Sequence, residues 1–266
     1  MNDPSHTERI TYTPIGYIHC DRSYRSEAPR QGVFADNSGT IKLLPGHNYE
    51  TALRDLDGFD RIWIIFDFHL NKNWKPIVSP PVTGEKSKIG VFATRSPHRP
   101  CSIGLTCARL VSIDSLTLHI RDFDILDGSP VLDIKPYIMD SDSFPDAARG
   151  WLPEQQILYP VTIEPNAEQK MVWLLENGGP DLKNFCLTQL CSEPFNARRK
   201  RVKQTASDHG TIHCRTWKMD FALNPEANEV LVKSIESNYS MEELNPEAPD
   251  PYSDKELHRQ FNLLYS

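Results

Sequence analysis

The 266-residue chain carries 36 acidic and 29 basic side chains, and its net charge of −7 excludes a bulk polycation that coats nucleic acid. Local basic patches can still bind RNA, because phosphate affinity depends on where Lys and Arg lie. Apolar residues make up 39% of the chain, but no stretch approaches the roughly 20 apolar residues of a membrane helix. The polar N-terminus has no apolar signal region, so we expect a protein of the cytoplasm, or of the nucleus, with no membrane partner.

The six cysteines are scattered, with no C-x-x-C pair, so we expect no disulfide framework. Five residues in the C-terminal third are of types that can bind zinc: Cys186, Cys191, His209, His213 and Cys214. The ligand spacing of known zinc sites is missing, so ordinary thiols and no metal are expected.

Residues 15–160 are rich in short candidate strands. The segment 61–69 is dense in β-branched and aromatic residues, as a buried strand is. Further candidates are residues 15–18, 89–93, 105–113, 117–123 and 131–134, and one helix is expected near 49–56, before Gly58. Many short strands with few helices favour a barrel or a sandwich.

Residues 71–88 form a basic stretch between two of these strands. Lys72, Lys75, Lys86 and Lys88 lie there among prolines, and we interpret the stretch as a solvated connection.

The character of the chain changes after residue 160. Helices are expected at 166–177 and 182–190, a strand at 211–221, and an extended tail that ends in a short helix. The densest basic run comprises Arg198, Arg199, Lys200, Arg201 and Lys203. We therefore predict a mainly β domain at residues 10–160 and a smaller α+β domain at 161–266.

The segment 90–105, G-V-F-A-T-R-S-P-H-R-P-C-S-I-G-L, combines a strand with a stiff loop. Arg95 and Arg99 on this proline-rich loop suit phosphate or carboxylate binding. A second segment, 124–138, reads D-I-L-D-G-S-P-V-L-D-I-K-P-Y-I around a tight turn. Asp133 and Lys135 are two residues apart, so they share one face of a strand and can form an ion pair.

Together the two segments resemble the TsaA/TrmO (YaeB-like) family of transfer-RNA adenine-N6 methyltransferases. The resemblance spans roughly residues 12–160 and includes A-P-R-Q-G at 28–32 and the strand at 62–69. Cys101 and Ser102 replace the family's Asn-Pro, and Ser129 replaces a Thr while keeping its hydroxyl. The family's later Asp-Pro-Arg-Pro motif aligns only loosely with residues 192–195.

The resemblance implies a single-sheeted β-barrel that binds S-adenosylmethionine as a homodimer and methylates the adenosine next to the anticodon of tRNA. In the family this adenosine already carries a threonylcarbamoyl group. The implied donor contacts are Pro29, Arg30, Gln31, His69, Leu70, Arg95, Leu105, Asp124, Ile125, Leu126 and Asp127. Asp133 or Tyr137 would polarise the acceptor N–H, with Lys135 beside them, unless Asp133 and Lys135 pair only to fix the turn.

The basic run at 198–203 is expected to contact RNA phosphates, with a solvated loop as the alternative. The main competing function is a barrel that binds S-adenosylmethionine as a sensor or partner module without catalysis, because fold does not fix function. A metal-dependent hydrolase lacks any ligand motif in this sequence.

Overall fold

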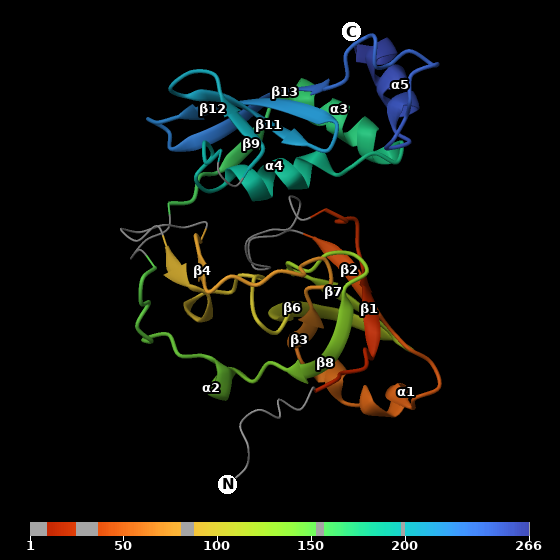
Figure 1. Cartoon of the computed structure of the whole chain (residues 1–266), viewed down its shortest axis with the longest axis vertical. Coiled ribbons are helices and arrows are strands. Elements are labelled where there is room, and N and C mark those ends of the chain that lie inside the picture. The colour runs from red at the N-terminus through yellow and green to blue at the C-terminus, as the bar shows by residue number, and fades with distance from the viewer. Residues whose placement is uncertain (1–9, 25–36, 81–87, 153–156, 198–199, 266) are drawn as a thin grey trace. The chain divides into compact units, whose positions relative to one another are not determined.

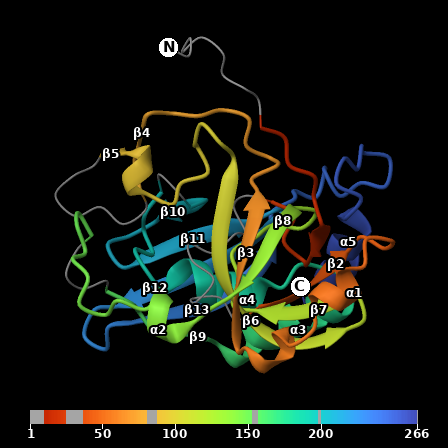
Figure 2. The same cartoon turned by 90° about the horizontal axis from the view of Figure 1, so that it is seen from below.

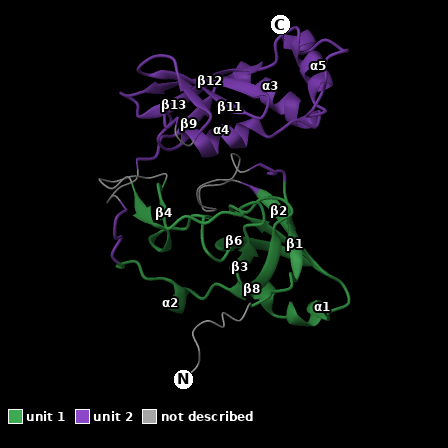
Figure 3. Cartoon of the chain, viewed as in Figure 1, with its two compact units in different colours: residues 1–20, 38–80, 88–147 green, residues 21–37, 81–87, 148–266 purple. Residues whose placement is uncertain are grey.

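The computed structural model describes residues 10–24, 37–80, 88–152, 157–197 and 200–265. Contacts divide the chain into two compact units, coloured separately in Figure 3. The first unit comprises residues 1–20, 38–80 and 88–147, and the second comprises 21–37, 81–87 and 148–266. The units therefore interleave along the sequence, and the domain boundary at residue 160 stays a prediction.

Six antiparallel strands of the first unit close into a barrel (Figures 1 and 2). Around the barrel the order is β1-β2-β7-β6-β3-β8. The strands are β1 (Gly16–His19), β2 (Ser38–Leu43), β3 (Arg61–Asp67), β6 (Ile103–Asp114), β7 (Thr117–Arg121) and β8 (Pro130–Pro136). This closure confirms the mainly β barrel expected from the sequence.

The alternation of buried and partly buried side chains along β3 shows how the barrel interior is filled. Ile62, Ile64 and Phe66 are buried inside, and the residues between them face outward and are only half-buried. Gly104 pairs with Phe66 across β3 and β6, and a side chain on Gly104 would overlap the Phe66 ring. Gly104 therefore makes room for a core aromatic ring.

Two expectations for the first unit need correction. Residues 89–93 do not form one strand: β5 (Ile89–Gly90) pairs with β4 (Ile77–Val78), and residues 91–93 turn into a 3-10 helix, η3 (Val91–Ala93). The helix expected at 49–56 is only the short α1 (Tyr49–Ala52), followed by the 3-10 turn η2 (Leu56–Gly58). A last short helix, α2 (Met139–Asp142), follows β8.

The second unit is built on a five-stranded sheet in the order β10-β11-β12-β13-β9. Its strands are β9 (Val161–Ile163), β10 (Val202–Gln204), β11 (His209–Cys214), β12 (Trp217–Asn224) and β13 (Glu229–Ser237). Helices α3 (Pro165–Glu176) and α4 (Leu182–Leu190) lie where they were predicted and share the core of the sheet. Asp181 caps α4, accepting a hydrogen bond from the Asn184 amide at 2.9 Å.

One further expectation is corrected here, and one is confirmed. The strand expected at 211–221 is a hairpin, because the chain reverses at Arg215 and Thr216, with Arg215 in the left-handed region at φ 52°. The short helix expected at the end of the tail is present as α5 (Lys255–Tyr265), which buries Phe261 in the core of the second unit. None of the helices among the described residues is long and apolar enough to cross a membrane.

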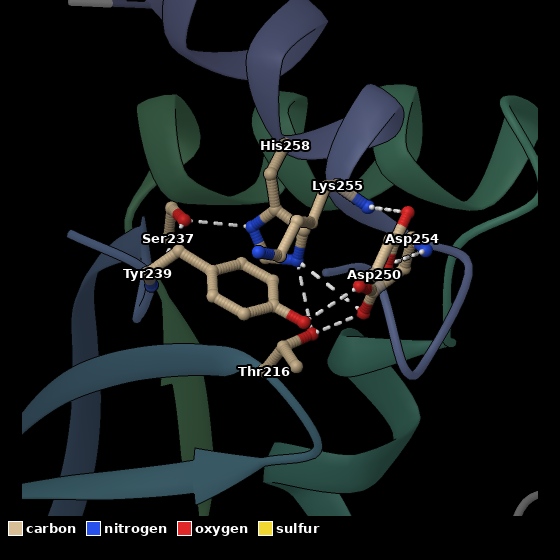
Figure 4. Close-up of polar contacts among 7 residues, drawn as sticks. All are labelled: Thr216, Ser237, Tyr239, Asp250, Asp254, Lys255 and His258. Carbon is tan, nitrogen blue, oxygen red and sulfur yellow. Dashed lines mark hydrogen bonds and ion pairs between the residues drawn. The ribbon is translucent and has the colours of Figure 1, made fainter. Parts of the chain in front are cut away.

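A buried polar network ties α5 to the sheet of the second unit (Figure 4). His258 has no solvent-exposed surface, and its two ring nitrogens lie 2.9 Å from the Thr216 hydroxyl and 2.7 Å from the Ser237 hydroxyl. Asp254 accepts hydrogen bonds from Thr216 at 2.6 Å and from the Tyr239 hydroxyl at 2.8 Å. Burial lowers the pKa of His258 to about 4, although Asp254 opposes this shift.

Candidate functional site

Antiparallel pairing brings three connections of the barrel to one end. Strands β1, β3 and β7 run toward this end, and β2, β8 and β6 begin there. Residues 20–37, 68–102 and 122–129 form the connections, and we call this the donor end of the barrel. These connections carry His69, Leu70, Arg95 and the run 124–127, which the family resemblance assigns to the methyl donor. Pro29, Arg30 and Gln31 belong to the first connection but lie outside the described residues.

The run 124–127 is tied to the end of β1. Oδ1 of Asp127 accepts a hydrogen bond from the Cys20 amide at 3.0 Å, and the Gly128 amide donates to the Ile18 carbonyl at 2.9 Å. Gly128 adopts a φ of 70°, which a residue with a side chain rarely adopts. Asp127 therefore holds the backbone at Cys20, directly after β1.

His69 lies two residues after the end of β3 and reaches across to Ser129, which directly precedes β8. Its Nδ1 lies 3.2 Å from the hydroxyl of Ser129, which is itself buried. The hydroxyl that Ser129 shares with the family's Thr is thus the group that contacts His69. This contact fixes the ring of one predicted donor-binding residue.

The two arginines of the 90–105 segment have different roles. Nη1 of Arg99 donates to the carbonyls of Thr94 at 2.7 Å and Val91 at 3.1 Å, so this guanidinium is folded back into its own loop. Arg95 is exposed. Of the two, Arg95 is therefore the one available to a carboxylate or phosphate, and Arg99 shapes the loop that presents it.

The outer wall of β6 adjoins this loop. Leu105 is 51% exposed there, and Cys107 lies two residues further along the same face. Burial raises the pKa of the Cys107 thiol, and the positive charges of Arg61 and Arg95 oppose this shift. Arg95 therefore lies within electrostatic reach of the wall that carries Leu105, another predicted donor contact.

A cleft of about 380 Å³ opens beside His69. It is lined by Asp67, Phe68, His69, Asn71, Lys72, Trp74, Arg99, Pro100 and Ser102. The Ser102 hydroxyl donates a hydrogen bond to the Asp67 carboxylate, and the Phe68 amide donates one to the Ser102 carbonyl at 2.7 Å. The segments 67–74 and 99–102 are thereby joined into one rigid surface.

Of the three predicted catalytic residues, Asp133 and Lys135 lie on β8 and Tyr137 directly follows it. Lys135 and Asp133 form an ion pair at 2.9 Å, and both side chains are largely exposed. The Tyr137 ring packs 5.9 Å from the ring of Trp63. Four residues of extended strand, roughly 13 Å, separate Asp133 from Tyr137, so the two side chains do not meet at one acceptor atom. Asp133 is the member nearer the donor end, because it pairs with Ile65.

The basic run is only partly described. Lys200 is buried, and its ammonium donates to the carbonyls of Gln189, Ser192 and Glu193. The prediction for Lys200 was therefore wrong, because its three donors are used within the protein. Arg201 and Lys203 are exposed on one face of β10 and remain predicted RNA contacts. Arg198 and Arg199 lie outside the described residues.

The cleft was not predicted from the sequence. Its one available signal was a tryptophan, Trp74, within residues 71–76, which are otherwise asparagine, lysine and proline. Its other walls come from 99–102, more than twenty residues away, and only the folded chain brings them together. Among the described residues, no group of three or more His, Cys, Asp or Glu side chains is placed to hold a metal ion.

The closed six-stranded barrel, with long connections at one end, defines a class of small antiparallel β-barrel proteins. A crystal structure of TrmO from Pseudomonas aeruginosa has this fold, with a TM-score of 0.64 and 24% identity, over 88% of this chain and 99% of that one. The sequence model of the tRNA-methyltransferase O N-terminal domain matches residues 17–143.

Two relatives extend the match beyond the barrel. The tRNA (adenine(37)-N6)-methyltransferase of Escherichia coli K12 is 34% identical over 199 residues, which are 71% of this chain and 83% of that protein. The rat protein of the same name is 31% identical over 268 residues, covering 94% of this chain but only 57% of its own length. The chain belongs to the tRNA-methyltransferase O family.

Proposed function

We propose that this chain is an S-adenosylmethionine-dependent methyltransferase that adds a methyl group to N6 of adenosine 37 of tRNA, next to the anticodon. The observation that carries the proposal is that the segments that the family uses for the donor lie together at one end of the barrel. The relatives named for this activity support it, because one of them is matched over 83% of its length.

The residues at the donor end fit the chemistry of S-adenosylmethionine, which supplies an electrophilic methyl group when bound. Exposed Arg95 suits the donor's carboxylate, and Asp124 or Asp127 suits its ribose hydroxyls. His69, held by Ser129, and Leu105 on the outer wall would complete the contacts. Residues 29–31 are proposed as further contacts on the family pattern alone.

The acceptor nitrogen needs positioning more than covalent chemistry. An exocyclic adenine amine is a weak nucleophile, so holding it in line with the methyl group supplies much of the rate. Asp133 is the predicted residue best placed to accept a hydrogen bond from the acceptor N–H, because it lies nearer the donor end than Tyr137 does. Its partner Lys135 would hold the Asp133 carboxylate in place through their ion pair.

We also propose a homodimer in the cytoplasm. The outer wall of the barrel and the segment after β8 expose Ile103, Leu105, Ile138 and Met139, apolar side chains that a second subunit would cover. Light scattering at working concentration should give a dimer mass, and a monomer that keeps full activity would refute this part of the proposal.

One assay tests the activity. Purified protein is incubated with methyl-labelled S-adenosylmethionine and tRNA, and the digested nucleosides are analysed by mass spectrometry. Transfer of one methyl group to N6 of adenosine 37 is expected, and parallel tRNA with and without the threonylcarbamoyl group shows which acceptor is used. Donor binding without transfer to either tRNA would instead identify a sensor.

A further inference from the structure

Trp74 stands out among the aromatic side chains of the first unit. Its indole is 54% exposed, yet it lines the cleft beside His69 instead of standing on an open surface. Exposing so much apolar area inside a cleft is unfavourable unless a ligand covers it. An aromatic face in a cleft is the usual partner of a planar ring.

The backbone on both sides of Trp74 is held by one residue. The Lys75 amide donates to the His98 carbonyl at 3.1 Å, and Nδ1 of His98 lies 3.3 Å from the Asn73 carbonyl. The side chain of Asn71 donates to the carbonyls of Asn73 at 3.0 Å and Pro97 at 2.7 Å. The indole is therefore carried on a loop that is already ordered, so binding to it costs little further conformational entropy.

The charge around the indole is positive, although the chain as a whole carries −7. Lys72 lines the cleft, and Lys75 is exposed next to Trp74. Asp67 is the acidic residue of the lining, and its carboxylate bonds the Ser102 hydroxyl. An aromatic face with flanking lysines matches a base together with its phosphates.

We infer that this cleft binds the acceptor nucleotide, with the target adenine stacked on Trp74 and the flanking phosphates on Lys72 and Lys75. The inference rests on the proposed function, and it assigns the acceptor site to residues that lie beside the donor end of the same barrel. His69 lines the cleft and is also a predicted donor contact, so an adenine stacked there lies next to the donor.

The first test compares Trp74→Ala, Trp74→Phe and the control Tyr12→Ala. Tyr12 is 60% exposed and precedes β1, at the barrel end opposite the donor end. Affinity is measured for an anticodon stem-loop RNA with adenosine at position 37. Trp74→Ala should weaken binding about 10-fold, since stacking on an aromatic ring contributes roughly 1–3 kcal/mol per base. Trp74→Phe should restore most of the affinity, and Tyr12→Ala should match the wild type.

A stem-loop that lacks the base at position 37 identifies what stacks on the indole. The wild-type protein should lose about as much affinity for it as Trp74→Ala loses for the intact RNA. Trp74→Ala should then bind the two RNAs equally, which is the signature of two groups that interact with each other. Independent, additive losses would overturn the inference.

The salt dependence of RNA binding tests the role of Lys72 and Lys75. The double variant Lys72→Gln with Lys75→Gln should flatten the dependence of log affinity on log salt by about 1.5, at roughly 0.7–0.9 per lost phosphate contact. Lys42→Gln is the matched control, because Lys42 is exposed on β2 toward the opposite end of the barrel. An unchanged slope in the double variant would remove the lysines from the site.

Donor affinity separates this inference from the proposed function. Trp74→Ala should bind S-adenosylmethionine as tightly as the wild type, and an equal loss for donor and RNA would mean that the cleft holds the donor instead. If the wild type transfers methyl groups and Trp74→Ala does so with unchanged kcat/KM, the inference fails alone. If the wild type transfers none, yet Trp74→Ala still loses RNA affinity, the proposed function fails and the cleft remains an RNA site.

Discussion

His69 and Ser129 meet at the donor end of the barrel, with Nδ1 of the imidazole 3.2 Å from the buried hydroxyl, although 60 positions separate them in the chain. The contact exists because β3 and β8 are neighbours in the closed barrel, so the residue after one strand lies beside the residue before the other. The Ser129 hydroxyl is thereby placed to orient the His69 ring, which is distant from it in sequence.

Ser129→Ala should weaken binding of S-adenosylmethionine by several-fold, because one buried hydrogen bond of about 1 kcal/mol no longer orients His69. Ser129→Thr keeps the hydroxyl and should bind nearly as the wild type does. Calorimetric titration of the three proteins measures the difference. Equal affinities for the Ala and Thr variants would show that the contact does not position the ring.

The two arginines of the 90–105 segment should separate binding from stability. Arg95→Ala should cost roughly 1.5–3 kcal/mol of donor binding, the range of a charged hydrogen bond, and leave the free energy of unfolding unchanged because Arg95 is exposed. Arg99→Ala should lower the free energy of unfolding by about 1–3 kcal/mol, because the Val91 and Thr94 carbonyls lose their donor. Calorimetry and urea unfolding on both variants test the contrast, which a donor-binding loss for Arg99→Ala with unchanged stability would contradict.

The barrel was predictable because its strands carry their own signals, the alternation of 61–67 above all. The hairpin of β11 and β12 was not, because its turn is Arg215–Thr216 and lacks the Asn or Gly that marks such turns. Each strand alternates buried and partly buried residues, and the phase shifts by one residue at the turn, from Ile212 and Cys214 in β11 to Trp217 and Met219 in β12.

The site was predictable only where a motif is contiguous. The segments 90–105 and 124–138 predict the donor loops, but nothing in them shows that Arg99 turns inward while Arg95 stays exposed. Lys200 illustrates the same limit: within a run of five basic residues, composition cannot show which ammonium the chain folds over and satisfies with carbonyls. The cleft around Trp74 depends on contacts between 67–74 and 97–102 that form only on folding.

Acid should destabilise the second unit through His258. Its pKa is lowered from an ordinary 6.5 to about 4, so the unfolded chain takes up a proton in this range before the folded one does. The contribution of neutral His258 to the free energy of unfolding is fully present above pH 6.5. It is lost as the pH falls toward 4, by up to about 3 kcal/mol. The negative charge of Asp254, which faces the ring, opposes the shift, and the pKa of about 4 already includes this effect.

Urea unfolding from pH 7 to pH 4 measures this slope, and His258→Gln is the informative variant. It should be less stable at pH 7, because the bonds to Thr216 and Ser237 are weakened. Its stability should also change less with pH. The remaining slope would belong to other groups, including His213, whose pKa burial also lowers. A slope identical to that of the wild type would show that His258 does not titrate on unfolding.

The basic run at 198–203 should divide into one structural residue and several RNA contacts. Lys200→Gln should lower the free energy of unfolding, since three carbonyls lose their donor, and should leave the salt dependence of tRNA binding unchanged.

Changing Arg201 and Lys203 to Gln should leave the free energy of unfolding unchanged but alter the salt dependence of tRNA binding, because both side chains are exposed. Their loss should weaken binding of every tRNA and flatten the log–log salt slope by about 1.5, at roughly 0.7–0.9 per contact. Filter binding across a salt series measures the slope, and donor affinity serves as the control that should not move. If the Arg201 and Lys203 double variant keeps the wild-type slope while the Lys72 and Lys75 variant does not, RNA docks through the cleft of the barrel without the run.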